Sequence, residues 1–235
     1  PILFYDKMQV VGPSGINRER FDEKMKLEQN RRLVTYYSLL TQMRVNGGND
    51  YINLVNSILS GKCNQVTCLE NYEFKVIGDF KRFNDLQQKM EAKFTLSRMI
   101  AGYAWEWKSK KNKSLYDMEL DGVKKQWNYR LENWVLSEDA DKQVGCIHTI
   151  QGFDLNFGFV IMGNEIGYDP KSKEIIVRPE NYYDQNGKRT ASKEELLEYI
   201  KHIYYVLMTR GIKGTYLYIC DNNLRKNISS IIGEI

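Results

Sequence analysis

The chain has 235 residues, of which 42% are hydrophobic and 27% are charged, a composition typical of a globular protein. This length allows one large domain, or one domain with a fragment of another. The formal net charge of +4 permits an anionic partner such as nucleic acid, although strongly basic nucleic-acid binders usually exceed it. No apolar run approaches the roughly 20 residues that span a bilayer, so we expect no membrane partner.

The cysteines and histidines do not predict a metal site. A zinc site needs four ligands in short pairs. Cys63 and Cys68 do not form a CxxC pair, and the two histidines, His148 and His202, are far apart in the sequence. We interpret the cysteines as reduced thiols, which favours a cytoplasmic protein.

The first 37 residues are expected to be the tail of a truncated first domain followed by a connector. Residues 2–5 are apolar and predict a buried strand that ends at Asp6. This strand is already under way without an initiator methionine or the basic region of a signal peptide, so we expect a piece of a longer protein. Charged residues dominate 17–32, which indicates a solvated helix or a flexible connector before a second domain at 38–235.

The second domain is predicted to alternate strands and helices. Apolar residues three or four positions apart predict an amphipathic helix at 51–59, which Gly61 stops, and a long helix that Ser192 caps. Further helices are expected at 82–93 and 223–232. Apolar runs predict strands at 74–77, 94–103, 144–149, 158–163, 173–178 and 215–220.

Continuous apolar strands alternating with helices favour a mainly parallel sheet with helices on both faces, so we predict an α/β fold. The strand at 173–178 lies between two prolines and is expected to be one arm of an inserted excursion that ends near Gly187. Residues 108–114 are rich in lysine and predict a basic surface loop.

The sequence lacks a phosphate-binding loop of its own. The pattern GxxxxGK[ST] does not occur, and the nearest fragment, Ser60-Gly61-Lys62-Cys63, has neither the upstream glycine nor the hydroxyl. There is also no GxGxxG after a strand and no nucleophile elbow. We therefore expect that this chain alone binds no nucleotide tightly and does not hydrolyse ATP.

One segment nevertheless suits phosphate chemistry. At 204–218 an apolar helix ends on Thr209 and Arg210, which we expect to be exposed, and a glycine-containing turn leads into a buried strand. An arginine at such a corner could act as an arginine finger, because its planar fork offsets charge on a transferring phosphoryl group. The alternative is a solvated arginine that the helix dipole favours.

Other polar residues recur at predicted strand ends. Ligands of open α/β sheets gather at the carboxyl ends of strands, and we expect these side chains to lie there. Asp6 and Gln9 follow the first strand, and Gln42 and Arg44 precede the helix at 51–59. A third group leaves the strand at 144–149, as His148-Thr149-Ile150-Gln151-Gly152-Phe153-Asp154, and Arg210 comes last.

In this order the residues resemble the second half of a superfamily 1 helicase core. Asp6 and Gln9 are similar to motif III, 42–44 to motif IV, 148–154 to motif V and 205–210 to motif VI. The motif sequences resemble still more closely those of the Schlafen-related family of bacterial P-loop proteins, which are described as DNA/RNA helicases. The resemblance covers nearly the whole chain and includes Gly102-Tyr103, Trp105-Glu106-Trp107 and Trp127-Asn128.

This resemblance implies a RecA-like second domain. Arg44 and Arg210 would reach the γ-phosphate of ATP, bound with Mg²⁺ on a missing N-terminal RecA-like domain, and Gln42 would lie beside that nucleotide. Asp6 and Gln9 would sense hydrolysis across the cleft.

The remaining motif residues would link the nucleotide to nucleic acid. Gln151, Gly152 and Asp154 would couple the nucleotide state to the track of single-stranded DNA or RNA, and His148 or Thr149 would contact the strand's backbone. Gly158-Phe159 departs from the aliphatic pair usual in helicases, which affects packing.

Structural interpretations remain open for these residues. Asp6 and Gln9 are also suited to cap a turn, His148 to a hydrogen-bonded structural role, and Asp154 to a solvated loop. The four tryptophans, Trp105, Trp107, Trp127 and Trp134, are suited to base stacking or to core packing.

A second function class therefore stands beside the ATPase fragment. In it the chain is a non-catalytic nucleic-acid-binding or scaffold module, and its arginines are surface salt-bridge partners. A GxxxxGKT loop and a strand ending in Asp-Glu upstream of residue 1 would distinguish the first class from the second.

Overall fold

A computed structural model describes residues 2–13, 15, 18–30, 35, 37, 42–63, 69–189 and 191–235. Its centre is a five-stranded sheet in the order β1–β9–β6–β2–β5, in which every neighbouring pair is parallel. The predicted α/β class with a mainly parallel sheet is therefore confirmed. The strands are β1 (Glu73–Val76), β2 (Ser97–Ala101), β5 (Val144–Cys146), β6 (Leu155–Met162) and β9 (Gly211–Ile219).

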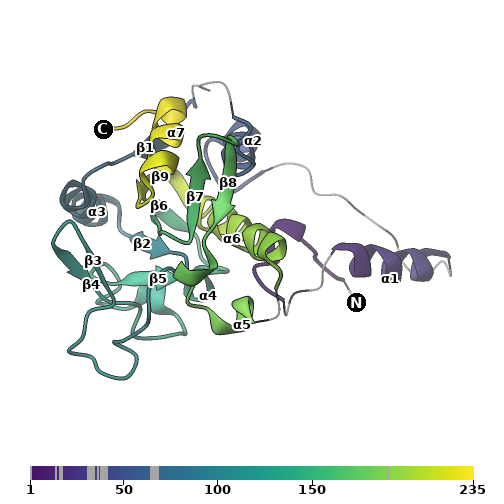
Figure 1. The fold of residues 1–235 in the computed structure, drawn as a ribbon, viewed down its shortest axis with the longest axis horizontal. Helices are drawn as coiled ribbons and strands as arrows, with labels where there is room; N and C mark the ends of the chain where they lie inside the picture. The colour runs from purple at the N-terminus through teal and green to yellow at the C-terminus, as the bar shows by residue number, and fades with distance from the viewer. Residues whose placement is uncertain are drawn as a thin grey trace.

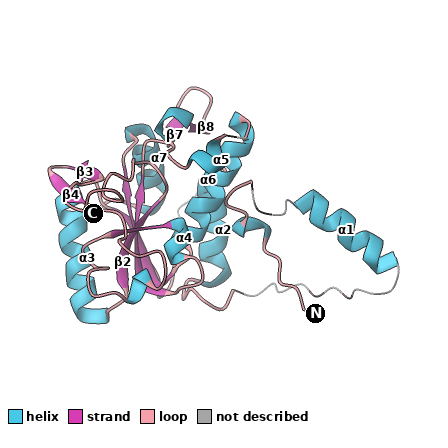
Figure 2. Ribbon diagram, turned by 90° about the horizontal axis from the view of Figure 1, so that it is seen from below, coloured by secondary structure: helices cyan, strands magenta, loops and turns pink. Residues whose placement is uncertain are grey.

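Helices cover both faces of this sheet, as Figure 2 shows with the sheet seen nearly edge-on. On one face the apolar sides of three helices pack against β1, β6 and β9 in a single core. These helices are α2 (Gly48–Leu59), α6 (Lys193–Met208) and α7 (Asn222–Ile232). On the other face α3 (Phe80–Phe94) packs on Phe157, Phe159 and Tyr216 in a second core. Burial on both faces explains why the strands have continuous apolar runs.

The long helix α6 begins where the sequence predicts. Ser192 and Glu195 form a capping box, in which the Ser192 side chain accepts from the Glu195 amide and the Glu195 carboxylate accepts from the Ser192 amide. Its apolar stripe includes Leu196, Ile200 and Ile203, all buried.

Two excursions interrupt the alternation. The first runs from β2 to β5 and contains the hairpin β3 (Met118–Leu120) and β4 (Val123–Lys125), then the short helix η2 (Trp134–Leu136). The second is the predicted one and contains the hairpin β7 (Ile166–Asp169) and β8 (Glu174–Val177). It continues through η3 (Pro179–Asn181) and α5 (Gln185–Lys188).

The predicted strand at 144–149 is only half strand. After β5 the chain forms one helical turn, α4 (Ile147–Ile150), because the Thr149 hydroxyl and the backbone of Cys146 cap each other. Strand β6 begins at Leu155, before the predicted start at Gly158.

The N-terminal segment differs more from its prediction. Residues 2–5 are not a strand, and Ile2 and Phe4 are 84% and 85% exposed. A strand needs a neighbour for its backbone groups, and the sheet of the described residues offers none there. The following turn η1 (Lys7–Gln9) docks on α6, where His202 Nδ1 lies 2.9 Å from the carbonyl oxygen of Val10.

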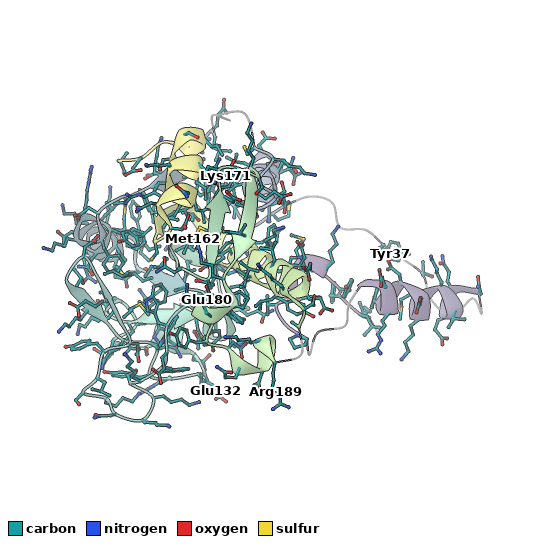
Figure 3. The ribbon with its side chains drawn as sticks, in the orientation of Figure 1. Tyr37, Glu132, Met162, Lys171, Glu180 and Arg189 are labelled. Atoms are coloured by element: carbon teal, nitrogen blue, oxygen red, sulfur yellow. The ribbon has the colours of Figure 1, made fainter. Side chains whose placement is uncertain are left out.

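The charged segment forms a solvated helix, α1 (Arg18–Asn30), which projects away from the sheet (Figure 1). Tyr5 stacks on Phe21 of this helix with ring centroids 4.1 Å apart. Tyr37, which is 87% exposed, also lies near α1 and away from the sheet (Figure 3). The predicted domain boundary at residue 38 falls on 38–41, outside the described residues. No described helix has the length and apolarity needed to cross a membrane.

Candidate functional site

The corner between α6 and β9 places Arg210 at the amino edge of the sheet. Helix α6 runs back along the sheet and ends at Met208, and β9 begins at Gly211. The carbonyl oxygen of Arg210 accepts a hydrogen bond of 2.9 Å from the amide of Leu155, the first residue of β6. Asp154 and Arg210 therefore precede neighbouring parallel strands. The prediction that they lie at the carboxyl ends is wrong, because a connecting helix returns the chain to the end where the next strand starts.

Five side chains from four segments gather at this edge, and we call them the arginine cluster: Asp6, Arg44, Asp154, Tyr205 and Arg210. Arg44 Nε lies 2.5 Å from Asp154 Oδ1. Arg210 is close enough to Arg44 that the two positive charges repel, while Asp154 and Asp6 oppose that repulsion. Four of these residues were selected from the sequence. Tyr205, one turn of α6 before Thr209, was not.

Arg210 is buried in this cluster. Only 2% of the residue is accessible, and Thr209 is 3% accessible, so the expected exposure of this pair is wrong. Burial, and then the positive charge of Arg44, lower the pKa of the Arg210 guanidinium to about 10, which leaves it charged at pH 7. Its Nε donates to the carbonyl oxygen of Val206 at 3.1 Å. Within the described part of the chain, its terminal nitrogens have no hydrogen-bond acceptor or carboxylate partner.

The backbone that carries Arg210 is held by buried hydroxyls. Tyr51 and Thr215 both donate to the carbonyl oxygen of Met208, at 2.8 and 3.0 Å. Tyr72 donates to the carbonyl oxygen of Gly211 at 3.0 Å and lies 2.9 Å from the Thr215 hydroxyl. Burial raises the pKa of Tyr72 to about 12, so this hydroxyl keeps its proton. The sequence placed Tyr51 in a helix and Thr215 in a strand and did not select Tyr72, since no local pattern reports a partner more than 100 residues away.

Arg44 is positioned by its own loop. The side-chain oxygen of Gln42 accepts from the Arg44 amide at 2.5 Å, and Asn49 accepts from the Gln42 amide at 3.1 Å. The amide of Asn46 donates to the carbonyl oxygen of Ile212 in β9 at 2.9 Å, which fixes the loop beside the Arg210 corner. Gln42 thus orients the loop in this structure.

Asp6 and Gln9 form a capped turn, the alternative that the sequence left open. One oxygen of the Asp6 carboxylate accepts from the Met8 amide and the other from Gln9 Nε2, each at 2.9 Å. The same carboxylate acts on the charge of Arg210, so it both caps the turn and faces the cluster.

Gln151 and Gly152 form an exposed turn that leads to Asp154. The Gln151 amide closes α4 by donating to the carbonyl oxygen of Ile147 at 3.2 Å. Gly152 has φ +92°, a backbone conformation that glycine adopts without strain, and a side chain at this position would meet nothing within 4 Å. This turn therefore leaves its backbone open to solvent.

His148 and Thr149 lie apart from the cluster, after the carboxyl end of β5. His148 is exposed, with its ring centroid 5.7 Å from that of Tyr103. Thr149 is 2% accessible, and its hydroxyl donates to the carbonyl oxygen of Cys146 at 2.9 Å and accepts from the Cys146 amide at 3.1 Å. Of the two, His148 has the accessible side chain.

Two of the tryptophans are core residues. Trp127 and Trp134 are fully buried, and a Cβ on Gly145 would lie 2.2 Å from the Trp134 ring. Across the described residues, no group of three or more His, Cys, Asp or Glu side chains could hold a metal ion. Cys146 and Cys220 are free thiols, and Cys68 lies outside the described residues.

Comparison with known proteins places the chain in a family. The family model for the Schlafen group 3 DNA/RNA helicase domain matches residues 1–221. An uncharacterized protein of Saccharomyces cerevisiae, YPL245W, is 28% identical over 216 aligned residues, which cover 82% of this chain and 47% of the yeast protein. The chain thus spans about half the length of this relative. No solved structure matches the chain.

Proposed function

Because this chain belongs to the Schlafen group 3 DNA/RNA helicase domain family, we propose that it is the second RecA-like domain of a nucleic-acid-dependent ATPase. In this proposal a preceding RecA-like domain binds ATP and Mg²⁺ and presents the γ-phosphate to Arg44 and Arg210. The order of the four helicase-like motifs, which resembles that of a superfamily 1 helicase core, supports this arrangement.

The observation that carries the proposal is the state of Arg210. It is a buried cation beside a second cation, and its terminal nitrogens have no protein acceptor among the described residues. Asp154 already offsets the charge of Arg44, whereas burial and the nearby charge of Arg44 disfavour the cation of Arg210, so a further anion would stabilise it. A phosphate oxygen suits the vacant donors of a guanidinium, whose fork matches phosphate geometry. The vacant donors of Arg210 therefore fit one phosphate, whereas the described residues hold no group of three or more His, Cys, Asp or Glu side chains for Mg²⁺.

Within this site the residues have separate tasks. The hydroxyls of Tyr51, Tyr72 and Thr215 hold the backbone on either side of Arg210. Arg210 would stabilise charge on the transferring phosphoryl group. Arg44 would break its ion pair with Asp154 and bind the same phosphoryl group. The released Asp154 carboxylate would then alter the Gln151–Gly152 turn. ATP, when bound, supplies the phosphoryl group. We propose that this exchange couples the nucleotide state to a nucleic-acid strand near His148.

A non-catalytic module is the second candidate, and the Arg44–Asp154 ion pair favours it, since that pair satisfies Arg44 without a ligand. Steady-state ATPase of the full-length protein, with and without single-stranded nucleic acid, separates the two. Under our proposal Arg210→Ala abolishes most turnover. Turnover unchanged by Arg210→Ala would favour the non-catalytic module.

A further inference from the structure

The excursion between β2 and β5 carries lysines placed over aromatic rings. Lys113 Nζ lies 3.9 Å from the centroid of the Tyr129 ring, Lys110 Nζ lies 5.5 Å from Trp107, and Lys124 Nζ lies 5.9 Å from Tyr116. We call these six residues the lysine–aromatic surface: Trp107, Lys110, Lys113, Tyr116, Lys124 and Tyr129.

A buried carboxylate fixes the backbone of this surface. Asp117 is 5% accessible and accepts from the Ser109 amide at 2.7 Å, the Ser109 hydroxyl at 2.5 Å and the Trp127 amide at 2.7 Å. Asp117, just before β3, thereby joins Ser109 at the start of the lysine-rich loop to Trp127, which follows β4. Hydrogen bonds to the hairpin therefore hold the start of this loop in place.

A second clamp holds the loop against Tyr129. Gln126 Nε2 donates to the carbonyl oxygens of Lys113 and Leu115, both at 2.7 Å, and Gln126 Oε1 accepts from the Tyr129 hydroxyl. These bonds keep Lys113 and the Tyr129 ring together. Because these side chains are already ordered in the free protein, they lose little conformational entropy when a ligand binds.

The charge of this surface is mostly uncompensated. Tyr116 and Tyr129 are 52% and 42% exposed, and the lysines on either side are exposed too. In the part of the chain that the structure describes, Lys110 and Lys113 have no carboxylate within 4 Å, and Lys124 has one, Glu119, at 3.9 Å.

This surface lies at the end of the sheet away from the arginine cluster. Asp121, at the tip of the β3–β4 hairpin, accepts from the Phe80 amide at 2.8 Å and from the Tyr218 hydroxyl at 3.1 Å, which places the hairpin by the carboxyl end of β9. Figure 1 shows β3 and β4 on the side of the molecule opposite α1, and Figure 3 shows Glu132, in the same excursion, far from Tyr37. Substitutions here should therefore leave the proposed phosphate site unchanged.

We propose that the lysine–aromatic surface binds single-stranded nucleic acid, with the lysines on the phosphates and the exposed tyrosine rings stacked on bases. Proteins that bind single strands combine a positive track with aromatic faces in this way. An acidic polypeptide would use the lysines but would gain little from the exposed rings. The inference rests on the proposed function for its nucleic acid and adds a binding surface outside the helicase-like motifs.

The test uses the full-length protein and fluorescein-labelled single-stranded DNA and RNA oligonucleotides of mixed sequence. Fluorescence anisotropy gives Kd across a series of salt concentrations. The double variant Lys110→Gln/Lys113→Gln should weaken binding about tenfold or more. It should also flatten the plot of log affinity against log salt by about 1.4, since each phosphate contact on a single strand contributes about 0.7.

Matched variants separate this surface from general basicity. Lys81→Gln/Lys89→Gln removes two exposed lysines of α3 and should change Kd less than about twofold. Tyr129→Ala should lose about tenfold, because stacking on one base is a large part of single-strand affinity, while Tyr129→Phe keeps the ring and should retain most of it. A melting curve for each variant checks folding.

Wild-type affinity and salt slope in Lys110→Gln/Lys113→Gln would overturn the proposal, as would an equal loss in the α3 control. Competition by polyglutamate as effective as that by unlabelled oligonucleotide would indicate an acidic polypeptide partner instead. ATPase without nucleic acid should be unaltered by the surface variants. If Arg210→Ala leaves turnover intact while the surface variants lose binding, the proposed ATPase function is contradicted and the binding surface is supported. If Arg210→Ala abolishes turnover while the surface variants bind as wild type does, only the binding surface is contradicted.

Discussion

Arg44 and Asp154 form an ion pair with Nε 2.5 Å from Oδ1, although one residue precedes α2 and the other precedes β6. The pair lies beside the buried Arg210, whose charge Arg44 repels and Asp154 attracts. In the proposed site Asp154 therefore competes with a phosphate for Arg44. A single carboxylate would then connect nucleotide binding with the turn at Gly152.

The first prediction concerns Asp154→Asn in the full-length protein. Without the competing carboxylate, Arg44 is free for phosphate, so we expect a lower KM for ATP together with weaker stimulation by single-stranded nucleic acid. The pair is half-exposed, so its loss should change the free energy of unfolding by less than about 1 kcal/mol. Steady-state ATPase with and without an oligonucleotide measures both effects. Wild-type KM and stimulation would show that the ion pair has no part in coupling.

Arg210 itself gives the second prediction. Arg210→Ala should cut turnover about 10³-fold or more with little change in nucleotide affinity, because an arginine finger acts on charge that develops in the transition state. Arg210→Lys should not restore turnover, since an ammonium lacks the planar fork. Arg189→Ala, at an exposed position, is the matched control and should behave as wild type. Equal turnover in the Lys and wild-type proteins would contradict the role.

The third prediction tests how the corner is held. In Tyr72→Phe the carbonyl oxygen of Gly211 loses its buried donor, which should lower the free energy of unfolding by about 1–3 kcal/mol. If the hydroxyl also positions Arg210, turnover should fall with nucleotide affinity unchanged. Chemical denaturation and ATPase, compared with Tyr183→Phe at an exposed position, measure the two effects. A loss of stability with full turnover would make Tyr72 a structural residue only.

The sequence predicted the sheet and its helices well because their signals are local. The apolar runs gave the strands, and Ser192 with Glu195 gave the start of α6. It predicted the strand at 2–5 wrongly, because an apolar run does not tell whether a neighbouring strand exists. It selected Arg44 and Arg210 but expected Arg210 to be exposed, since burial at a corner depends on segments distant in sequence. The hydroxyls of Tyr51, Tyr72 and Thr215 were missed for the same reason.

The last prediction concerns Glu165, a buried carboxylic acid after β6. Burial raises the pKa of Glu165 from 4.5 to about 7, although the hydrogen bond from Tyr204 acts in the opposite direction. Its Oε2 has no hydrogen-bond partner in the described part of the chain, so the protonated form suits this site. The buried groups that act with it are Tyr182, Tyr204 and Cys220.

Between pH 4.5 and 7 the folded protein keeps the Glu165 proton, whereas the unfolded chain releases it. Glu165 therefore contributes to the free energy of unfolding fully below pH 4.5, and this contribution is lost as the pH rises through 7. We expect about 3 kcal/mol of this contribution to disappear between pH 4 and pH 8, because one pKa unit corresponds to about 1.4 kcal/mol. Glu165→Gln cannot ionise, so its free energy of unfolding should fall less than that of wild type over this range. Denaturant unfolding of both proteins at pH 5, 6, 7 and 8 measures the difference, and parallel pH dependences would show that Glu165 does not titrate in the fold.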